Sequence, residues 1–182
     1  MSSVGRFFLR AANKFPIFEK TIDAMEALAV DLIEEFYSED IMSVNHSKII
    51  HRISVALDRY DAEYEVLPEL ELELSTGKCK PDVCVYPKLP EDWDNDIIFY
   101  TQPPLIAIEI QSPKQATTEI TAKMNAIYFP AGVKSVWLIV PVLRLVQIRT
   151  PGGGIWTFTD GTIKDPVLPI EVPFRAIFRQ FV

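Results

Sequence analysis

Two apolar segments near the middle of the chain each carry one acidic residue, and this pair constrains the fold more than any other feature. Residues 80–86 contain Asp82, and residues 105–113 contain Glu109. Segments so rich in valine and isoleucine are typical of buried β-strands. An unpaired carboxylate is costly to remove from water unless it is neutralised, paired or bound to a metal. The two acids therefore indicate a metal site on a sheet.

Strand alternation predicts which side chains share a face with these acids. Every second residue of a strand points to the same side, so Glu109 shares its face with Ala107 and Gln111, and Asp82 shares its face with Cys84. If the two strands are neighbours, the carboxylates meet over small side chains. Carboxylate oxygens are the ligands that Mg²⁺ and Mn²⁺ prefer. The alternative that the pattern leaves open is two acids at strand ends facing solvent.

A predicted helix over 115–129 brings a lysine to the same region. It follows the Glu109 strand after a turn containing Pro113, and we expect it to end before Pro130. Lys123 falls inside the apolar stripe of this helix. A lysine in such a stripe either extends its ammonium group to solvent or meets an acid. Lys123 is therefore a candidate partner of Glu109, and a lysine with a solvated head is the alternative.

The order and spacing of these residues resemble the Uma2 or DUF820 family of endonucleases, within the PD-(D/E)XK nuclease superfamily. The resemblance implies an α/β fold like that of restriction endonucleases, with a mixed central sheet flanked by helices. A looser likeness, at 45–50, concerns the histidine-containing start of a helix. The motifs that carry the close resemblance are 81–85, 104–113, Lys123 with Tyr128, and 131–140.

The resemblance also implies roles for individual residues. Asp82 and Glu109 would bind Mg²⁺ or Mn²⁺, with the backbone carbonyl of Ile110 as a further ligand. The lysine of the superfamily normally lies two residues after the glutamate, where this chain has Gln111, and Lys123 on the next helix is the natural substitute. The candidate catalytic residues are therefore Asp82, Glu109, Lys123 and Gln111. The expected activity is hydrolysis of phosphodiester bonds in nucleic acid, with DNA as the favoured substrate.

Charge keeps two other functions open. The formal net charge is −7, whereas general affinity for DNA comes mainly from lysine and arginine side chains that neutralise phosphates. Together with Gln111 in place of lysine, this charge favours a module that kept the nuclease fold and acts in binding or assembly. A metal-dependent hydrolase of a smaller phosphate ester would also tolerate the negative charge.

Length and composition indicate one domain over 1–182, because a chain of 182 residues that is 48% hydrophobic can bury a single core. No apolar run approaches the roughly 20 residues needed to span a bilayer, and the first 20 residues lack the apolar core of a signal peptide. The cytoplasm is the expected compartment. Cys79 and Cys84 are expected to stay unpaired, and a zinc site that combines them with His46 and His51 is disfavoured.

Hydrophobic periodicity predicts the remaining elements. In the strand expected over 64–74, Pro68 marks an edge or a bulge, and the glutamates that alternate with apolar residues are expected to face solvent, although one of them could add an acid to the site. The other predicted elements are helices over 21–37 and 44–58 and strands over 135–140, 144–149 and 155–159.

Two further features bear on the site and on assembly. His46 lies near the start of the second predicted helix, where a capping or surface histidine is favoured over one that reaches the site. Residues 163–182 end in a short aromatic helix that suits docking onto the core or onto a second copy of the chain. A homodimer is expected, because duplex DNA has two strands to cut and two-fold oligomers are common.

Overall fold

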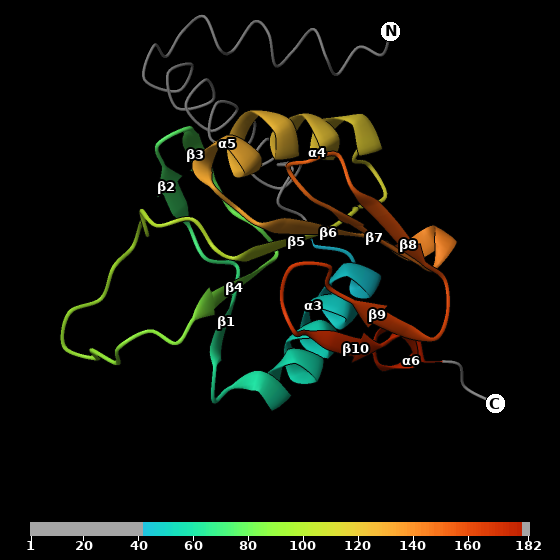
Figure 1. Cartoon of the computed structure of the whole chain (residues 1–182), viewed down its shortest axis with the longest axis horizontal. Coiled ribbons are helices and arrows are strands. Elements are labelled where there is room, and N and C mark those ends of the chain that lie inside the picture. Colours follow the sequence, from blue (N-terminus) through green and yellow to red (C-terminus); the bar gives the residue numbers. More distant parts are fainter. Residues whose placement is uncertain (1–41, 180–182) are drawn as a thin grey trace, which may run out of the picture. The chain divides into compact units, whose positions relative to one another are not determined.

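A six-stranded mixed sheet forms the centre of the fold in a computed structural model that describes residues 42–179 (Figure 1). Neighbouring strands are antiparallel except for β5 and β6, which are parallel. The mixed sheet and its flanking helices confirm the predicted α/β class, whereas the helix predicted over 21–37 lies outside the described residues. In spatial order the strands are β1 (Tyr64–Pro68), β4 (Val83–Pro87), β5 (Ile106–Ile110), β6 (Ser135–Val140), β7 (Leu145–Arg149) and β8 (Ile155–Phe158).

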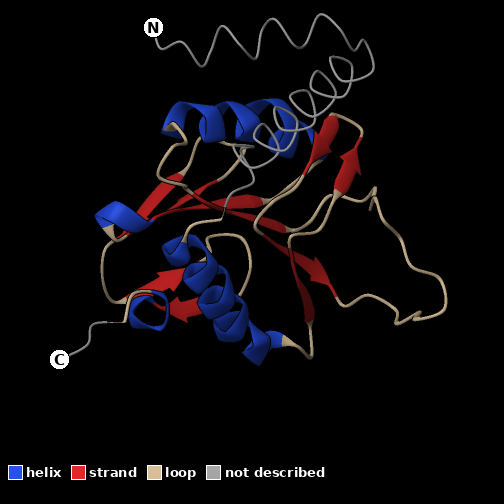
Figure 2. Cartoon of the chain, turned by 180° about the vertical axis from the view of Figure 1, so that it is seen from behind, coloured by secondary structure: helices blue, strands red, loops and turns tan. Residues whose placement is uncertain are grey.

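The parallel pair requires a crossover, and a continuous helical segment over one face of the sheet provides it (Figures 1 and 2). The segment consists of α4 (Thr117–Lys123), the π-helix η2 (Met124–Tyr128) and α5 (Phe129–Ala131). The predicted helix is therefore present, but its predicted end before Pro130 is wrong. A proline lacks an N–H and collides with the carbonyl four residues back in an α-helix. The wider π turn just before Pro130 relieves this conflict, and the helix ends at Gly132, whose φ is 108°.

The two faces of the sheet carry the alternation that the sequence predicts. On one face Cys84, Ala107 and Leu138 pack with residues of the crossover helix, among them Ile120 and Met124. The opposite face packs on α3 (Val44–Leu57) and on the C-terminal elements β9 (Thr162–Lys164), β10 (Glu171–Pro173) and α6 (Phe174–Ile177). This face contributes the buried residues Val83, Val85, Ile106, Ile108 and Ile110. The acids and the apolar residues of β4 and β5 are thus sorted by strand parity.

The segment between α3 and β4 contains three short strands rather than the single strand predicted over 64–74. After α3 and a 3₁₀ turn, η1 (Asp58–Tyr60), β1 runs along the edge of the sheet, as Pro68 indicates. The chain then turns at Glu69, which has a positive φ of 55°. A separate hairpin follows, formed by β2 (Leu72–Leu74) and β3 (Gly77–Cys79). The predicted single strand over 64–74 is therefore wrong, because the left-handed backbone at Glu69 divides it.

The C-terminal elements are joined to β6 by a buried carboxylate. Beyond η3 (Pro141–Leu143) and the β7–β8 hairpin, Asp165 precedes the loop that leads to β10. It accepts hydrogen bonds from Ser135 Oγ at 2.6 Å and Trp137 Nε1 at 2.7 Å. The backbone N–H groups of Val167 and Leu168, each at 2.8 Å, complete its set of donors. The C-terminal segment therefore docks onto the core of its own chain.

Two smaller expectations concern the cysteines and the membrane. Cys79 and Cys84 are free, as predicted, and both are buried. Between residues 42 and 179, none of the helices has the length and apolarity needed to cross a bilayer.

Candidate active site

Asp82 is fixed at the start of β4 by groups from two other elements. The N–H of Ile110, on β5, donates to Asp82 Oδ2 at 2.5 Å. On the other side, Nε2 of His46, from the first turn of α3, lies 2.7 Å from Oδ1. The carboxylate remains 16% exposed. Both oxygens are thus oriented while one edge of the group stays accessible.

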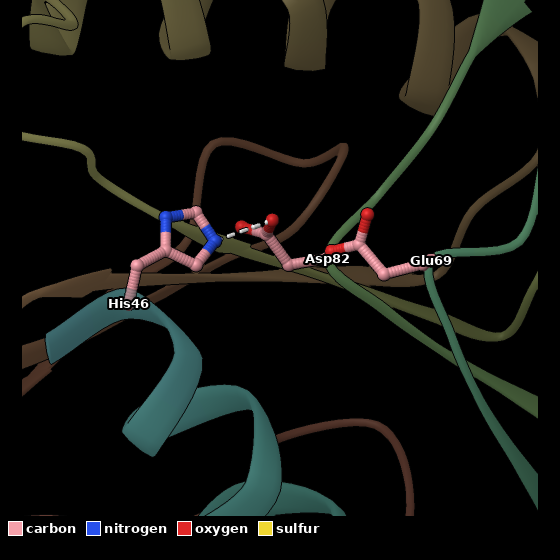
Figure 3. A group of neighbouring side chains, drawn as sticks. All are labelled: His46, Glu69 and Asp82. Atoms are coloured by element: carbon pink, nitrogen blue, oxygen red, sulfur yellow. Dashed lines mark hydrogen bonds and ion pairs between the residues drawn. The ribbon is translucent and has the colours of Figure 1, made fainter. Parts of the chain in front are cut away.

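His46 belongs to this site, and the favoured interpretation of a capping or surface histidine is wrong. Ser43 caps α3 by accepting from the His46 N–H at 3.3 Å, which leaves the imidazole to point toward Asp82 (Figure 3). The side chain is only 13% exposed. Burial lowers the pKa of His46, but the hydrogen bond to Asp82 and the charges of Asp82, Glu69 and Glu109 outweigh it and raise the pKa overall. The folded protein therefore favours the protonated imidazole.

Glu69 is a third side chain that could hold a metal ion at this position. One donor atom from each of His46, Glu69 and Asp82 lies within 4.8 Å of the others (Figure 3). The Glu69 N–H donates to the carbonyl of Asp82 at 3.1 Å, and Lys80 Nζ lies 3.4 Å from the Glu69 carboxylate. The sequence placed Glu69 only among several glutamates of a predicted strand. The signal for its role is the turn after Pro68, which redirects this one side chain.

Glu109 lies in a drier environment than Asp82. It is 4% exposed, on the face of β5 that the crossover helix covers. Lys123 Nζ lies 2.8 Å from Oε1, and the Tyr128 hydroxyl donates to the same oxygen. Lys123 also donates to the backbone carbonyl of Lys80 at 3.3 Å. The structure therefore brings Lys123 to Glu109, as the stripe position indicates, and adds Tyr128.

The charge of Glu109 is balanced against its burial. Burial raises the pKa of Glu109, whereas the charge and hydrogen bond of Lys123 and the hydrogen bond of Tyr128 lower it, and the charge of Asp82 raises it. The net direction is upward. The negative charges of Asp82 and Glu109 repel each other. Lys123, which contacts Glu109 and the backbone carbonyl of Lys80, offsets part of this repulsion.

Gln111 and Ile110 lie beside the acids but make different contacts. The Gln111 amide donates to the Gln115 carbonyl at 2.9 Å and to Thr117 Oγ1 at 3.0 Å. It thereby ties the end of β5 to the start of α4. Ile110 contributes its backbone to the site and its side chain to the opposite core. The structure thus gathers Asp82, Glu109 and Lys123, and directs the Gln111 amide nitrogen to the turn.

Comparison with known proteins agrees with this arrangement. The sequence profile of the Uma2 family, described as "Putative restriction endonuclease", matches residues 26–175. The chain belongs to the Uma2 family. A similar solved structure is that of a "putative nuclease belonging to DUF820" from Anabaena variabilis, with a TM-score of 0.61 and 21% identity over 76% of this chain and 82% of that chain. At this identity the likeness shows the fold alone.

No curated protein matches the chain significantly. Membership of the Uma2 family confirms the resemblance drawn from the strands around Asp82 and Glu109 and from the residues that follow Lys123. It associates the chain with nucleases in general.

Proposed function

We propose that this Uma2-family protein is a metal-dependent endonuclease that hydrolyses phosphodiester bonds, with DNA as its substrate. The observation that carries the proposal is the convergence of two acids from neighbouring strands, one beside a histidine and a second carboxylate, the other beside a lysine. Family membership supports the reaction class. The expected cofactor is Mg²⁺ or Mn²⁺.

The residues present fit a divalent cation. Carboxylate oxygens suit Mg²⁺ and Mn²⁺, and an imidazole nitrogen extends the donor set toward transition metals such as Mn²⁺. The donors of His46, Glu69 and Asp82 already lie close together. Glu109 and the carbonyl of Ile110 are the ligands implied by the family resemblance. Asp82 is common to both sets, so we place the cation at Asp82.

The chemistry that such a cation supplies when bound is a more acidic water and neutralisation of charge at the attacked phosphate. Asp82 and Glu109 hold the negative charge on which binding of the cation depends. Lys123 holds a positive charge between the segments of the two acids, where it orients the attacking water and the phosphate oxygens. Gln111 supports this lysine indirectly, because its amide fixes the turn into the helix that carries Lys123.

The test compares the wild-type chain with a variant carrying Asp82→Asn and Glu109→Gln. These substitutions remove both charges and keep the shape of the side chains. Mg²⁺ and Mn²⁺ are titrated calorimetrically, and cleavage of mixed DNA and RNA substrates is assayed alongside, with circular dichroism as the check on folding. We expect cation binding and cleavage in the wild type and loss of both in the folded variant.

Other outcomes would redirect the assignment. Weak cation binding that the variant retains, with no cleavage, would favour the binding or assembly module. Cleavage of small phosphate esters but not of nucleic acid would favour the smaller substrate. A Glu109→Gln protein with the full rate of DNA cleavage would contradict the proposed role of that acid.

A homodimer remains part of the proposal, since two-fold assembly suits a substrate with two strands. Phe174 and Ile177 of the C-terminal helix are buried against the core of their own chain. A dimer would therefore use other surfaces. Light scattering that finds a monomer at high protein concentration would remove this part of the proposal.

A further inference from the structure

The π turn of the crossover helix places two polar side chains on the same buried acid. Lys123 and Tyr128 are five residues apart, and on a regular α-helix such residues point about 140° away from each other. In η2 the N–H of Phe129 bonds to the carbonyl of Met124, five residues back. Such a wide turn brings residues five apart to one side. Both side chains consequently reach Glu109.

Contacts outside the helix hold this turn in place. The Thr76 hydroxyl, from the β2–β3 hairpin, donates to the carbonyl of Ile127 at 2.8 Å. The N–H of Val133 donates to the carbonyl of Tyr128 at 3.1 Å, again five residues back. Pro130 follows at a position that a regular α-helix accommodates poorly. The wide turn is therefore built into the sequence around Tyr128, and π turns of this kind are frequent at functional sites.

The two donors act on one oxygen of Glu109 and leave the other available. Lys123 Nζ and the Tyr128 hydroxyl both contact Oε1, and within residues 42–179 Oε2 has no hydrogen-bond partner. Tyr128 is fully buried, and Lys123 Nζ lies 5.3 Å from the centre of its ring. Tyr128 therefore fixes Glu109 directly and confines the lysine beside it. A carboxylate restrained at Oε1 presents Oε2 as its ligand atom.

We propose that Tyr128 is a positioning residue of the metal site, which holds Oε1 of Glu109 so that Oε2 is free to bind the cation. The inference rests on the proposed function, because it requires a cation at the two acids. Partners that orient a metal ligand affect affinity strongly, and their loss typically weakens metal binding about 10- to 100-fold. Without the hydroxyl, the Glu109 carboxylate can rotate and offer either oxygen to Lys123.

The experiment compares Tyr128→Phe with Tyr86→Phe in the chain of 182 residues. Tyr86 is a matched control, because it is 2% exposed in the same apolar cluster and its hydroxyl donates to the carbonyl of Gln102 at 2.8 Å. Mn²⁺ is titrated calorimetrically into each protein. Thermal unfolding is measured in a chelator, and kcat and KM are measured for plasmid cleavage.

We expect Tyr128→Phe to weaken Mn²⁺ binding about tenfold or more, and Tyr86→Phe to leave it within about twofold, since that hydroxyl does not touch the acids. Thermal unfolding in the chelator measures the loss of stability that each substitution causes when no metal is bound. A Tyr128→Phe protein that binds Mn²⁺ as the wild type does would overturn the inference alone. A wild type that binds no Mn²⁺ would overturn the proposed function and this inference with it.

Discussion

Asp82 and Glu109 are chemically similar acids on neighbouring strands, yet they are held in opposite ways. Asp82 precedes its strand, stays 16% exposed and is oriented by a backbone N–H and by His46. Glu109 lies within its strand, is 4% exposed and is compensated by a lysine and a tyrosine from the crossover helix. Asp82 is held by α3 and β5, which lie on either side of it in the chain, whereas Glu109 is held by the crossover helix that follows it.

The difference shows how one site can combine accessibility with a fixed charge. The accessible acid keeps contact with solvent, and a backbone N–H and the His46 imidazole orient it. The buried acid requires a cationic partner, since burial raises its pKa. We therefore expect the Asp82 half to determine whether a cation binds, and the Glu109 half to couple the site to the stability of the fold.

The strongest test of this division is Asp82→Asn. The amide can still accept from the N–H of Ile110 but loses the charge beside His46. We expect DNA cleavage to fall about a thousandfold or more, because several kcal/mol of transition-state stabilisation are removed, while the free energy of unfolding changes little. Initial rates and urea unfolding measure the two effects. A variant that loses stability but keeps its rate would reverse the comparison.

The second test concerns the buried ion pair between Lys123 and Glu109. Lys123→Met leaves Glu109 without its cation, and we expect the free energy of unfolding to fall by about 3 kcal/mol. Lys164 is the control, because it lies at the same 2.8 Å from Glu171 but both side chains are more than half exposed. Lys164→Met should cost under about 1 kcal/mol. Equal losses in urea unfolding would show that burial does not distinguish the two pairs.

The third test varies pH and concerns the accessible half of the site, which contains Asp82, His46 and Glu69. Because the folded protein raises the pKa of His46, protonation of the imidazole stabilises the metal-free fold fully below the unfolded value of about 6.5, and this contribution is lost as pH rises through the folded pKa. We expect the stability advantage of the wild type over His46→Gln to shrink between pH 6 and pH 9. His51→Gln, on the exposed side of the same helix, is the matched substitution in that series.

The smallest expected effect belongs to Glu69, which assists Asp82 without replacing it. Glu69→Gln removes one of three grouped donors, and we expect Mn²⁺ affinity to fall about tenfold. Glu65→Gln is the control, because Glu65 lies on the same edge segment and pairs with Lys88 at 3.1 Å. An unchanged Mn²⁺ affinity in Glu69→Gln would restrict the accessible half to Asp82 and His46.

Sequence patterns predicted the acids and the lysine because each breaks a local rule. A charge in an apolar strand or stripe is visible in the order of residues alone, and strand parity then places Asp82 and Glu109 on one sheet face. The family resemblance added the role of Lys123 as the substitute for the lysine that Gln111 replaces. These inferences depend only on spacing within one element, on the pairing of two consecutive strands, or on one short turn.

The remaining parts of the site depend on geometry that spacing does not encode. Glu69 reaches Asp82 only because its backbone adopts a left-handed turn and β1 pairs with β4 in a particular register. His46 is directed by the packing of α3 under the sheet. Tyr128 reaches Glu109 through a π turn, whereas helical periodicity assumes 3.6 residues per turn throughout. Pro130 is the visible sign of that turn, although a proline at this position predicts the end of a helix.

The buried carboxylate of Asp165 also makes one tryptophan a natural optical reporter. Trp137 is fully buried and donates its indole N–H to Asp165, whereas Trp93 and Trp156 are 89% and 39% exposed. The three indoles therefore emit from different surroundings. Release of the C-terminal elements β9 and β10 from β6 would expose Trp137 to solvent and shift its emission to longer wavelength. Intrinsic fluorescence thus follows the docking of these two strands without an added label.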